Sequence, residues 1–284
     1  MNERGHLIGV AYRMLGTVAD AEDAVQEAYA RWYRLPSAER DAIEVPRAWL
    51  TRVVGRICLD VLGSARVRRE SYVGEWLPEP VPAHDAVGPG ADPAEHAALQ
   101  DSVALALLVV LEQLTPAERV AFVLHDVFAV PFAEIAEAVG RSSAACRQLA
   151  STARRRVQAT ATGTAPRPQR DALVQAFAAA CARGDLTALI AVLDPAVTLR
   201  ADGGGAVSAA RRPVRGARDV ARFLLGILAK NPGARIEEIR TGDGVGHLWR
   251  DDDGVRGVVV LGVDGGRVTD VWTVLNPAKL TAWT

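Results

Sequence analysis

The side chains with the clearest capacity for chemistry lie in the segment PFAEIAEAVGRSSAACRQLASTARRRV, residues 131–157. Its second half is rich in short polar and guanidinium side chains, which hydrogen-bond to the base edges and phosphates of DNA. The residues that we expect to face DNA are Ser143, Arg147, Gln148, Ser151, Arg154 and Arg155. Arg147 and Gln148 are the expected readers of base edges, whereas Arg154 and Arg155 are expected to contact phosphate. A surface helix of another arginine-rich protein would share part of this composition, so that alternative stays open.

Charge alternates along the first half of the chain, although the formal net charge is only −1. Residues 20–44 hold seven acidic side chains against three arginines, a net charge of −4. Residues 47–69 hold six arginines and one aspartate, and residues 141–156 hold five arginines and no acid, so each segment has a net charge of +5. A solvated helix face explains any single run of this kind. Two basic segments combined with an acidic one favour a DNA-binding protein that also docks on a basic protein.

Two short helices around a glycine turn must position the first set of side chains. The expected buried face of the first helix consists of Phe132, Ile135, Ala136 and Val139, spaced at i, i+3, i+4 and i+7. Gly140 stands where a helix ends in a left-handed residue, and Ser142 can cap the helix that follows. The expected inner stripe of the second helix consists of Ala145, Leu149, Ala153 and Val157. The segment therefore predicts a helix-turn-helix.

Proline and glycine clusters divide the rest of the chain. Helices are expected over 5–15, 18–34 and 46–62, in a first domain of residues 1–72. The stretch 73–92 is rich in proline and glycine and predicts a linker to a second domain, 93–160. Asp92 and Thr115 each precede a proline and then a glutamate, which predicts two helix starts. A second linker is expected at 161–169.

Residues 170–284 differ in kind from the helical part. Helices are expected at 170–183, 185–193 and 216–230. Strands are expected near 196–201, 235–241, 245–250, 255–263 and 267–275, because apolar runs there are bounded by Asp-Gly and Gly-Gly turns. This order predicts an α+β domain with a curved sheet wrapped over helices.

The sequence predicts no catalytic residue, metal site or cofactor. His247 is the one histidine of residues 170–284, and a lone histidine in a strand is usually structural. Gly203–Gly205 lacks the helix and lysine of a phosphate loop, so we interpret it as a turn. The three cysteines lie far apart, and no apolar run approaches the ~20 residues of a membrane span. No export signal is visible, so a cytoplasmic protein that is not an enzyme is expected.

The chain resembles an extracytoplasmic-function (ECF) RNA polymerase sigma factor, of the group with a C-terminal SnoaL-like (nuclear-transport-factor-like) domain. DAEDAVQEAYARWYR (20–34) resembles the core-binding helix of sigma region 2, and AWLTRVVGRICLDVLGSARVRRE (48–70) resembles the helix that meets the −10 element. LTPAERVAFVLHDVF (114–128) with the helix-turn-helix resembles region 4, which reads the −35 element. YVGEWLPEP (72–80), DGGGAV (202–207) and NPAKL (276–280) resemble motifs of the SnoaL-bearing group. The implied fold is two all-α sigma domains followed by an α+β SnoaL-like cone domain.

The resemblance also implies sites and partners. Core RNA polymerase is expected to contact Asp20, Asp23, Glu27 and Arg31. The −10 element is expected to contact Arg52, Arg56, Arg66, Arg68 and Arg69, which can follow the phosphates of melted DNA. The relatives imply that the C-terminal domain regulates the sigma domains in cis, through Trp76, Leu77, Asp202, Gly203, Gly204, Gly205, Asn276, Pro277, Lys279 and Leu280.

Two alternatives remain beside this interpretation. The chain could be a DNA-binding regulator that never contacts polymerase, although the acidic helix 20–34 would then have no task. The C-terminal domain could bind or convert a small apolar ligand, and this would be compatible with a sigma factor.

Overall fold

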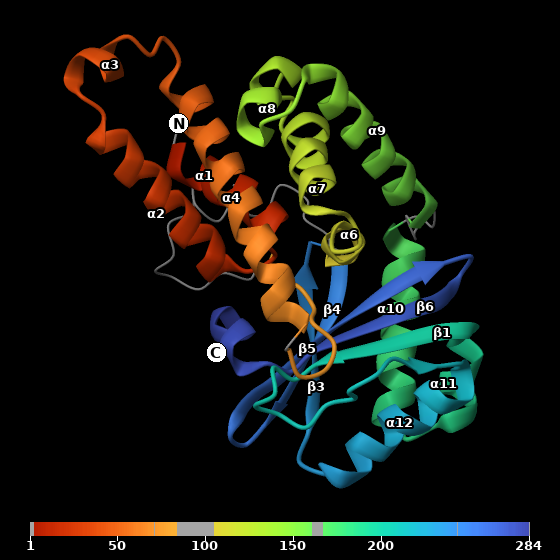
Figure 1. Ribbon diagram of the computed structural model, residues 1–284. Helices are drawn as coiled ribbons and strands as arrows, with labels where there is room; N and C mark the ends of the chain where they lie inside the picture. The colour runs from red at the N-terminus through yellow and green to blue at the C-terminus, as the bar shows by residue number, and fades with distance from the viewer. Residues whose placement is uncertain (1–2, 71, 84–104, 161–166, 243, 284) are drawn as a thin grey trace. The chain divides into compact units, whose positions relative to one another are not determined.

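The computed structural model describes residues 3–70, 72–83, 105–160, 167–242 and 244–283, without the side chains of residues 65–70, 160 and 167 (Figure 1). The described chain forms two compact units. The helical unit contains residues 3–70 and 107–160, and the sheet unit contains residues 72–83, 105–106 and 167–283.

The first part of the helical unit is a bundle of apolar helices. Its elements are α1 (Glu3–Leu15), α2 (Val18–Arg34), the short α3 (Ser37–Asp41) and α4 (Pro46–Glu70). The Thr17 side chain accepts a hydrogen bond from the Asp20 amide, which fixes the start of α2. Leu7 and Val10 of α1 and Val54 of α4 have no solvent exposure, so the helices bury a common core.

The second part contains the predicted helix-turn-helix. Its elements are α6 (Leu105–Leu111), α7 (Pro116–Phe122), the π-helical turn η2 (Val123–Val127), α8 (Phe132–Val139) and α9 (Ser143–Thr160). Thr115 and Glu118 form a reciprocal capping box at α7. Gly140 ends α8 with φ 69°, and Ser142 accepts a hydrogen bond from the Ala145 amide, as predicted. The predicted helix start at Asp92 lies outside the described residues.

Helices from the two parts pack against each other within the helical unit. A Cβ atom added to Gly55 of α4 would lie 3.0 Å from Leu124 Cδ1, so a glycine allows this close approach. Arg119 of α7 is 3% exposed and donates hydrogen bonds to the Met14 carbonyl (2.9 Å) and the Glu112 carboxylate (2.6 Å). Burial lowers the pKa of Arg119 to about 10, which still leaves it charged at neutral pH.

The sheet unit has the expected α+β architecture (Figure 1). Its strands are β1 (Leu193–Asp202), β2 (Val214–Arg215), β3 (Arg235–Thr241), β4 (Gly244–Asp251), β5 (Gly254–Asp264) and β6 (Arg267–Val274). They form one sheet in the order β2-β1-β6-β5-β4-β3, with β1 and β6 parallel and the other pairs antiparallel. The helices are α10 (Arg167–Ala182), α11 (Leu186–Val192) and α12 (Ala217–Lys230). Val174, Phe177, Leu189 and Val220 from these helices pack with Val271 and other strand residues in one core.

An extended segment of residues 72–83, here called the strap, also belongs to the sheet unit. Leu77, Pro78 and Glu79 are buried, and the Ala83 amide donates a hydrogen bond to the Arg240 carbonyl. Two turns of 3-10 helix, η3 (Pro277–Lys279) and η4 (Thr281–Trp283), follow β6. Trp283 Nε1 donates a 2.8 Å hydrogen bond to the Pro80 carbonyl. Residues 73–92 were expected to form a linker. Of these, residues 73–83 are described, and most of them are packed against the sheet unit.

Candidate functional site

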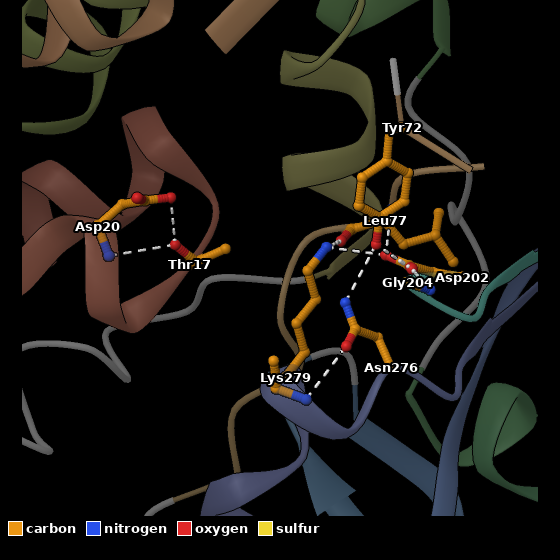
Figure 2. Close-up of polar contacts among 9 residues, drawn as sticks. Thr17, Asp20, Tyr72, Leu77, Asp202, Gly204, Asn276 and Lys279 are labelled. Carbon is orange, nitrogen blue, oxygen red and sulfur yellow. Dashed lines mark hydrogen bonds and ion pairs between the residues drawn. The ribbon is translucent and has the colours of Figure 1, made fainter. Parts of the chain in front are cut away.

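The predicted polymerase-contacting residues lie on the outer side of α2. Asp20 and Asp23 are exposed, and Glu27 and Arg31 follow at spacings of four residues. Arg31 Nε donates a 2.9 Å hydrogen bond to Glu27, and this contact lowers the pKa of the Glu27 carboxyl group. Thr17 holds Asp20 through its hydroxyl, which donates to Oδ2 at 2.6 Å (Figure 2). An anionic helix face with partly fixed carboxylates results.

The described −10 arginines of α4 have partners within the helical unit. Arg52 forms an ion pair with Glu137 of α8. Arg56 Nη1 donates a 3.4 Å hydrogen bond to the Ala138 carbonyl, and its Nε lies 3.8 Å from Asp60. The side chains of Arg66, Arg68 and Arg69 lie outside the described part of α4. The contact between α4 and α8 therefore occupies two of the side chains predicted to bind DNA.

The predicted −35 residues are distributed along α9. Arg147, Gln148 and Arg155 are exposed, and Ser143, Ser151 and Arg154 are half-buried. Arg154 forms an ion pair of 2.5 Å with Asp126 of η2. Arg147 lies with its guanidinium carbon 5.7 Å from the centre of the Phe132 ring. Arg147 and Gln148 are thus available to a partner, whereas Arg154 is restrained by a carboxylate.

The buried stripe of α9 is displaced from the prediction. Cys146, Ala150 and Ala153 have no solvent exposure, whereas Ala145 and Leu149 are only half-buried. The prediction is correct at Ala153. At the two preceding positions the buried residues are Cys146 and Ala150, each one residue after the predicted Ala145 and Leu149. Packing of α9 against both α7 and α8 decides this rotation, and helical periodicity alone does not specify it.

Asp202, at the end of β1, is the centre of a buried polar cluster in the sheet unit (Figure 2). Its Oδ2 accepts hydrogen bonds from Lys279 Nζ at 2.8 Å and from the Leu77 amide at 2.9 Å. Its Oδ1 accepts from the Tyr72 hydroxyl at 2.5 Å and from the Gly204 amide at 3.0 Å. Asp202 is 0% exposed and Lys279 is 5% exposed. One carboxylate therefore joins the strap, the turn after β1 and the 3-10 helix after β6.

Lys279 completes this cluster, which we call the anchor. Besides Asp202 it donates to the Leu77 carbonyl, and its Nζ lies 4.0 Å from the centre of the Trp76 ring. Such a cation–π contact is stronger when it is desolvated. Burial and the hydrogen bond to Asp202 raise the pKa of Tyr72 well above its usual range, so its hydroxyl stays a donor. Both Lys279 and Tyr72 therefore donate hydrogen bonds to Asp202, the lysine as a cation and the tyrosine as a neutral hydroxyl.

The glycine turn and the NPAKL motif shape the anchor. Gly203 begins a turn in which its carbonyl accepts from the Ala206 and Val207 amides, as predicted. Gly204 has φ +63°, and a Cβ atom there would lie 2.5 Å from the Asn276 side chain. Asn276 Nδ2 donates to the Tyr72 hydroxyl at 3.1 Å. Gly205, Pro277 and Leu280 complete the set, with Pro277 starting η3 and Leu280 buried at 3% exposure.

All the residues predicted as regulatory contacts are thus brought together in one unit. The prediction omitted Tyr72 and Trp283, which also bond the strap to the sheet unit. Tyr72 lies in the motif YVGEWLPEP, so that motif already contained the signal. Trp283 had no signal, because only the folded chain brings its indole to the Pro80 carbonyl.

The inner face of the sheet carries buried polar atoms without a partner among the described residues. They are His247 Nδ1, Trp249 Nε1 and Thr273 Oγ1. His247 and Thr273 both pair with Val259 in the strand register, so they lie in one row across the sheet. Burial lowers the pKa of His247 to about 4, so this imidazole is neutral at pH 7.

The described residues contain no group of three or more His, Cys, Asp or Glu side chains that could hold a metal ion. None of their helices combines the length and apolarity that crossing a membrane would require.

Comparison with known proteins finds sigma-factor family models and sigma-factor relatives. The family model "Sigma-70 region 2" matches residues 2–70, and "Sigma-70, region 4" matches residues 104–157. The ECF RNA polymerase sigma factor SigJ of Mycobacterium tuberculosis is 44% identical, over 98% of this chain and 91% of SigJ. The probable ECF sigma factor SigI of the same species is 36% identical over 98% and 92%. The crystal structure of SigJ aligns with a TM-score of 0.77 at 41% identity, covering 99% and 96% of the two chains.

Proposed function

This chain belongs to the ECF RNA polymerase sigma factors, and on that premise we propose how its parts share promoter-directed initiation. The protein is an alternative sigma factor that binds core RNA polymerase and directs transcription from specific promoters. It works where polymerase and DNA are, in the cytoplasm. The sheet unit controls this activity in cis by holding the strap.

The acidic face of α2 is the surface for polymerase, because Asp20, Asp23 and Glu27 lie away from the buried face formed by Ala21, Ala24, Val25 and Ala28. Exposed ion pairs contribute only ~0–1 kcal/mol each, so the interface also needs apolar contacts. Arg52 and Arg56 of α4 serve the −10 element together with Arg66, Arg68 and Arg69. Arg147 and Gln148 of α9 read bases of the −35 element, and Ser143, Ser151, Arg154 and Arg155 support them.

One observation carries the regulatory part of the proposal. The strap lies between sigma region 2 and sigma region 4 in the sequence, yet it is bonded into the C-terminal unit by the anchor. The length of the segment that joins two promoter-reading regions limits the distance between them. When the anchor holds residues 72–83, those twelve residues cannot lengthen the connection between the regions. Release of the strap therefore changes how the regions engage polymerase and promoter.

Transcription by purified core polymerase from a library of random promoters tests this proposal. Tyr72→Phe removes one donor to Asp202 and keeps the ring, whereas Lys279→Met removes the buried cation. Arg235→Gln is the matched control, since its ion pair with Asp252 at 2.7 Å lies exposed in the same unit.

We expect Tyr72→Phe and Lys279→Met to change the transcript yield in the same direction, and Arg235→Gln to leave it unchanged. Transcript yields that are equal for all three variants and the wild type would contradict regulation through the strap. Failure of every variant and of the wild type to direct any initiation would contradict the sigma-factor assignment itself.

A second candidate function is small-molecule binding by the inner face of the sheet. The unpartnered His247, Trp249 and Thr273 atoms support it, because buried polar groups without partners are costly and a ligand or water can satisfy them. We assign no reaction to this face, since His247 Nδ1 has no hydrogen-bond partner among the described residues to orient the ring. Native mass spectrometry of the purified protein tests this function. A retained ligand that is lost in His247→Leu supports binding.

A further inference from the structure

Five exposed arginines lie within a stretch of twelve residues of the sheet unit, 211–222, and neither the anchor nor the sigma regions use them. They are Arg211, Arg212, Arg215, Arg218 and Arg222, with Asp219 as the single acid between Val207 and Phe223. Arg215 is on β2, the outermost strand at one edge of the sheet. Arg218 and Arg222 are four residues apart on α12, so they share one face of that helix. We call these five residues the arginine edge.

Arginines of β3, β4 and β5, the three strands farthest from β2, are in contrast neutralised by carboxylates. Arg235 pairs with Asp252 at 2.7 Å, Arg250 with Glu237 at 3.6 Å and Arg256 with Asp251 at 2.5 Å. The arginine edge forms no ion pair with any described residue. The two groups of arginines therefore differ in uncompensated charge. Uncompensated positive charge on one edge creates a local potential that attracts a polyanion.

The backbone beside the arginine edge adds to this potential. A cleft of about 460 Å³ is lined by Arg218 and Asp219 of α12, by Gly216 and by Arg267 of β6. Arg267 is held in place by donating to the carbonyls of Ala191 and Leu193. Gly216 begins α12 and gives it no side-chain cap, so the first amide groups of the helix lack a side-chain acceptor, although Asp219 is an acid in the same turn. Amide groups at a helix start favour phosphate oxygens, and the two guanidinium groups reinforce that preference.

We propose that the arginine edge binds the phosphate backbone of duplex DNA next to the −35 element. This inference goes beyond the regulatory role of the anchor and rests on the protein being a promoter-binding sigma factor. The tether supports DNA as the partner. α9 ends at Thr160 and α10 begins at Arg167, so six residues join the −35-reading helix to the sheet unit. The seven steps from Thr160 to Arg167, at ~3.3–3.6 Å each, span at most about 25 Å. Once α9 is bound to DNA, this short tether keeps the sheet unit close to the same DNA. The effective concentration of DNA for a contact by the sheet unit is therefore high.

The full-length protein tests this proposal with a random-sequence DNA duplex and no polymerase. The dissociation constant is measured by fluorescence anisotropy over a series of salt concentrations. The edge variant is Arg211→Gln/Arg215→Gln/Arg218→Gln. The control variant is Arg235→Gln/Arg250→Gln/Arg256→Gln, which removes the same three charges and changes the formal net charge from −1 to −4 in the same way.

A plot of the logarithm of the DNA association constant against the logarithm of the salt concentration has a negative slope. Each lost phosphate contact reduces the magnitude of this slope by about 0.9. We expect the edge variant to reduce the magnitude of the slope by up to about 2.7 and to weaken DNA binding, while the control keeps the wild-type slope. Arg212→Gln/Arg222→Gln should give an intermediate loss. Equal slopes for the edge and control variants would overturn the proposal. So would an edge variant that keeps its DNA affinity but loses affinity for core polymerase, since the surface would then bind protein. The strap variants at Tyr72 and Lys279 leave the arginine edge intact, so the two proposals are tested by different substitutions.

Discussion

At the scale of single residues, Asp202 is the most consequential position in the sheet unit. Its two oxygens accept four hydrogen bonds, and its buried cation comes from a residue 77 positions away. A buried ion pair is weak evidence for stability, because desolvating both charges offsets their attraction. We expect its effect to be on specificity, since the observed placement of the strap satisfies both oxygens of Asp202. Removal of one charge, in contrast, leaves the other buried and uncompensated.

Lys279→Met should therefore destabilise the sheet unit by about 3 kcal/mol, the usual cost of breaking a buried pair. Denaturant unfolding followed by tryptophan fluorescence measures this loss. The double variant Asp202→Asn/Lys279→Met should recover part of it, because both charges are then absent. Arg235→Gln should cost at most ~1 kcal/mol, as its pair is exposed. A loss for Lys279→Met as small as that would show that the anchor is not buried in solution.

His247 should make stability depend on pH. Its folded pKa of about 4 lies below the ordinary value of 6.5 because burial disfavours the cation. Between these values the unfolded chain binds more protons, so stability is complete above pH 6.5 and falls as the pH drops towards 4. The loss over this window is about 3 kcal/mol. In His247→Gln the pH dependence should be reduced by that amount in denaturant titrations at pH 7, 6, 5 and 4. An unchanged slope would mean that His247 is accessible to protons in the folded state.

Arg147 and Arg154 should affect DNA binding differently. Arg147 is exposed on α9, whereas Arg154 is paired with Asp126 near the end of that helix. Arg147→Ala should cost ~1–3 kcal/mol at a −35 element and little on other DNA, since a bidentate contact to guanine discriminates by that amount. Arg154→Ala should weaken all duplexes alike, as phosphate contacts do. Footprint titrations on matched and scrambled −35 sites measure both effects. Equal losses at both sites for both variants would refute this division.

At the scale of elements, two glycines of α4 provide a matched test of its packing. Gly63 is exposed with no atom within 4 Å of an added Cβ, whereas Gly55 would place its Cβ 3.0 Å from Leu124. Replacement of a helical glycine by alanine stabilises by ~0.5–1 kcal/mol where space permits. Gly63→Ala should therefore raise the free energy of unfolding by this amount. Gly55→Ala should gain less, because Leu124 must move. Equal gains would argue against close packing of α4 on Leu124.

The elements of the chain were largely predictable, because most of them carry their own local signal. The helix over 18–34 matches its prediction at both ends, since Thr17 caps it and Leu35 precedes a proline. The five predicted strands all form, within three residues of their expected ends. The two-residue strand β2 was missed because it is too short to show a period. The turn η2 was missed too, since π-helical geometry has no composition of its own.

The strap shows why the site was only partly predictable. Its prolines and glycine indicate a segment that forms neither helix nor strand, and this is correct. Whether such a segment is free or packed depends on residues far away in the sequence. The Leu77 amide bonds to a carboxylate 125 positions away, and the Pro80 carbonyl to an indole 203 positions away. The motifs identified most of the participating residues, but only the folded structure shows that they contact Asp202.

At the scale of the whole molecule, the two sigma regions contact each other inside the helical unit. Arg52 pairs with Glu137, and Arg56 donates to the Ala138 carbonyl. Both arginines are predicted to bind DNA, so we expect the contact between α4 and α8 to compete with the promoter. Promoter binding should then require this contact to open. Its energy cost subtracts directly from DNA affinity.

Glu137→Gln should weaken this competition. The ion pair is partly exposed and contributes ~0–1 kcal/mol, so affinity for promoter DNA should rise by at most about fivefold. Anisotropy with a promoter duplex measures the gain. Glu134→Gln, a substitution on the same helix without a described ion pair, is the control for the lost negative charge. A gain of the same size in both variants would assign the effect to net charge instead.

The order of residues in the anchor has a consequence for protein synthesis. Residues 1–160 leave the ribosome before Lys279 has been added, and about 120 further residues separate the end of α9 from this lysine. At ~5–20 residues per second, translation of that stretch takes roughly 6–24 s. During this interval a nascent chain carries both promoter-reading regions but has no lysine to close over Asp202. In newly made molecules the strap therefore stays without its lysine partner for a period whose length is set by elongation speed.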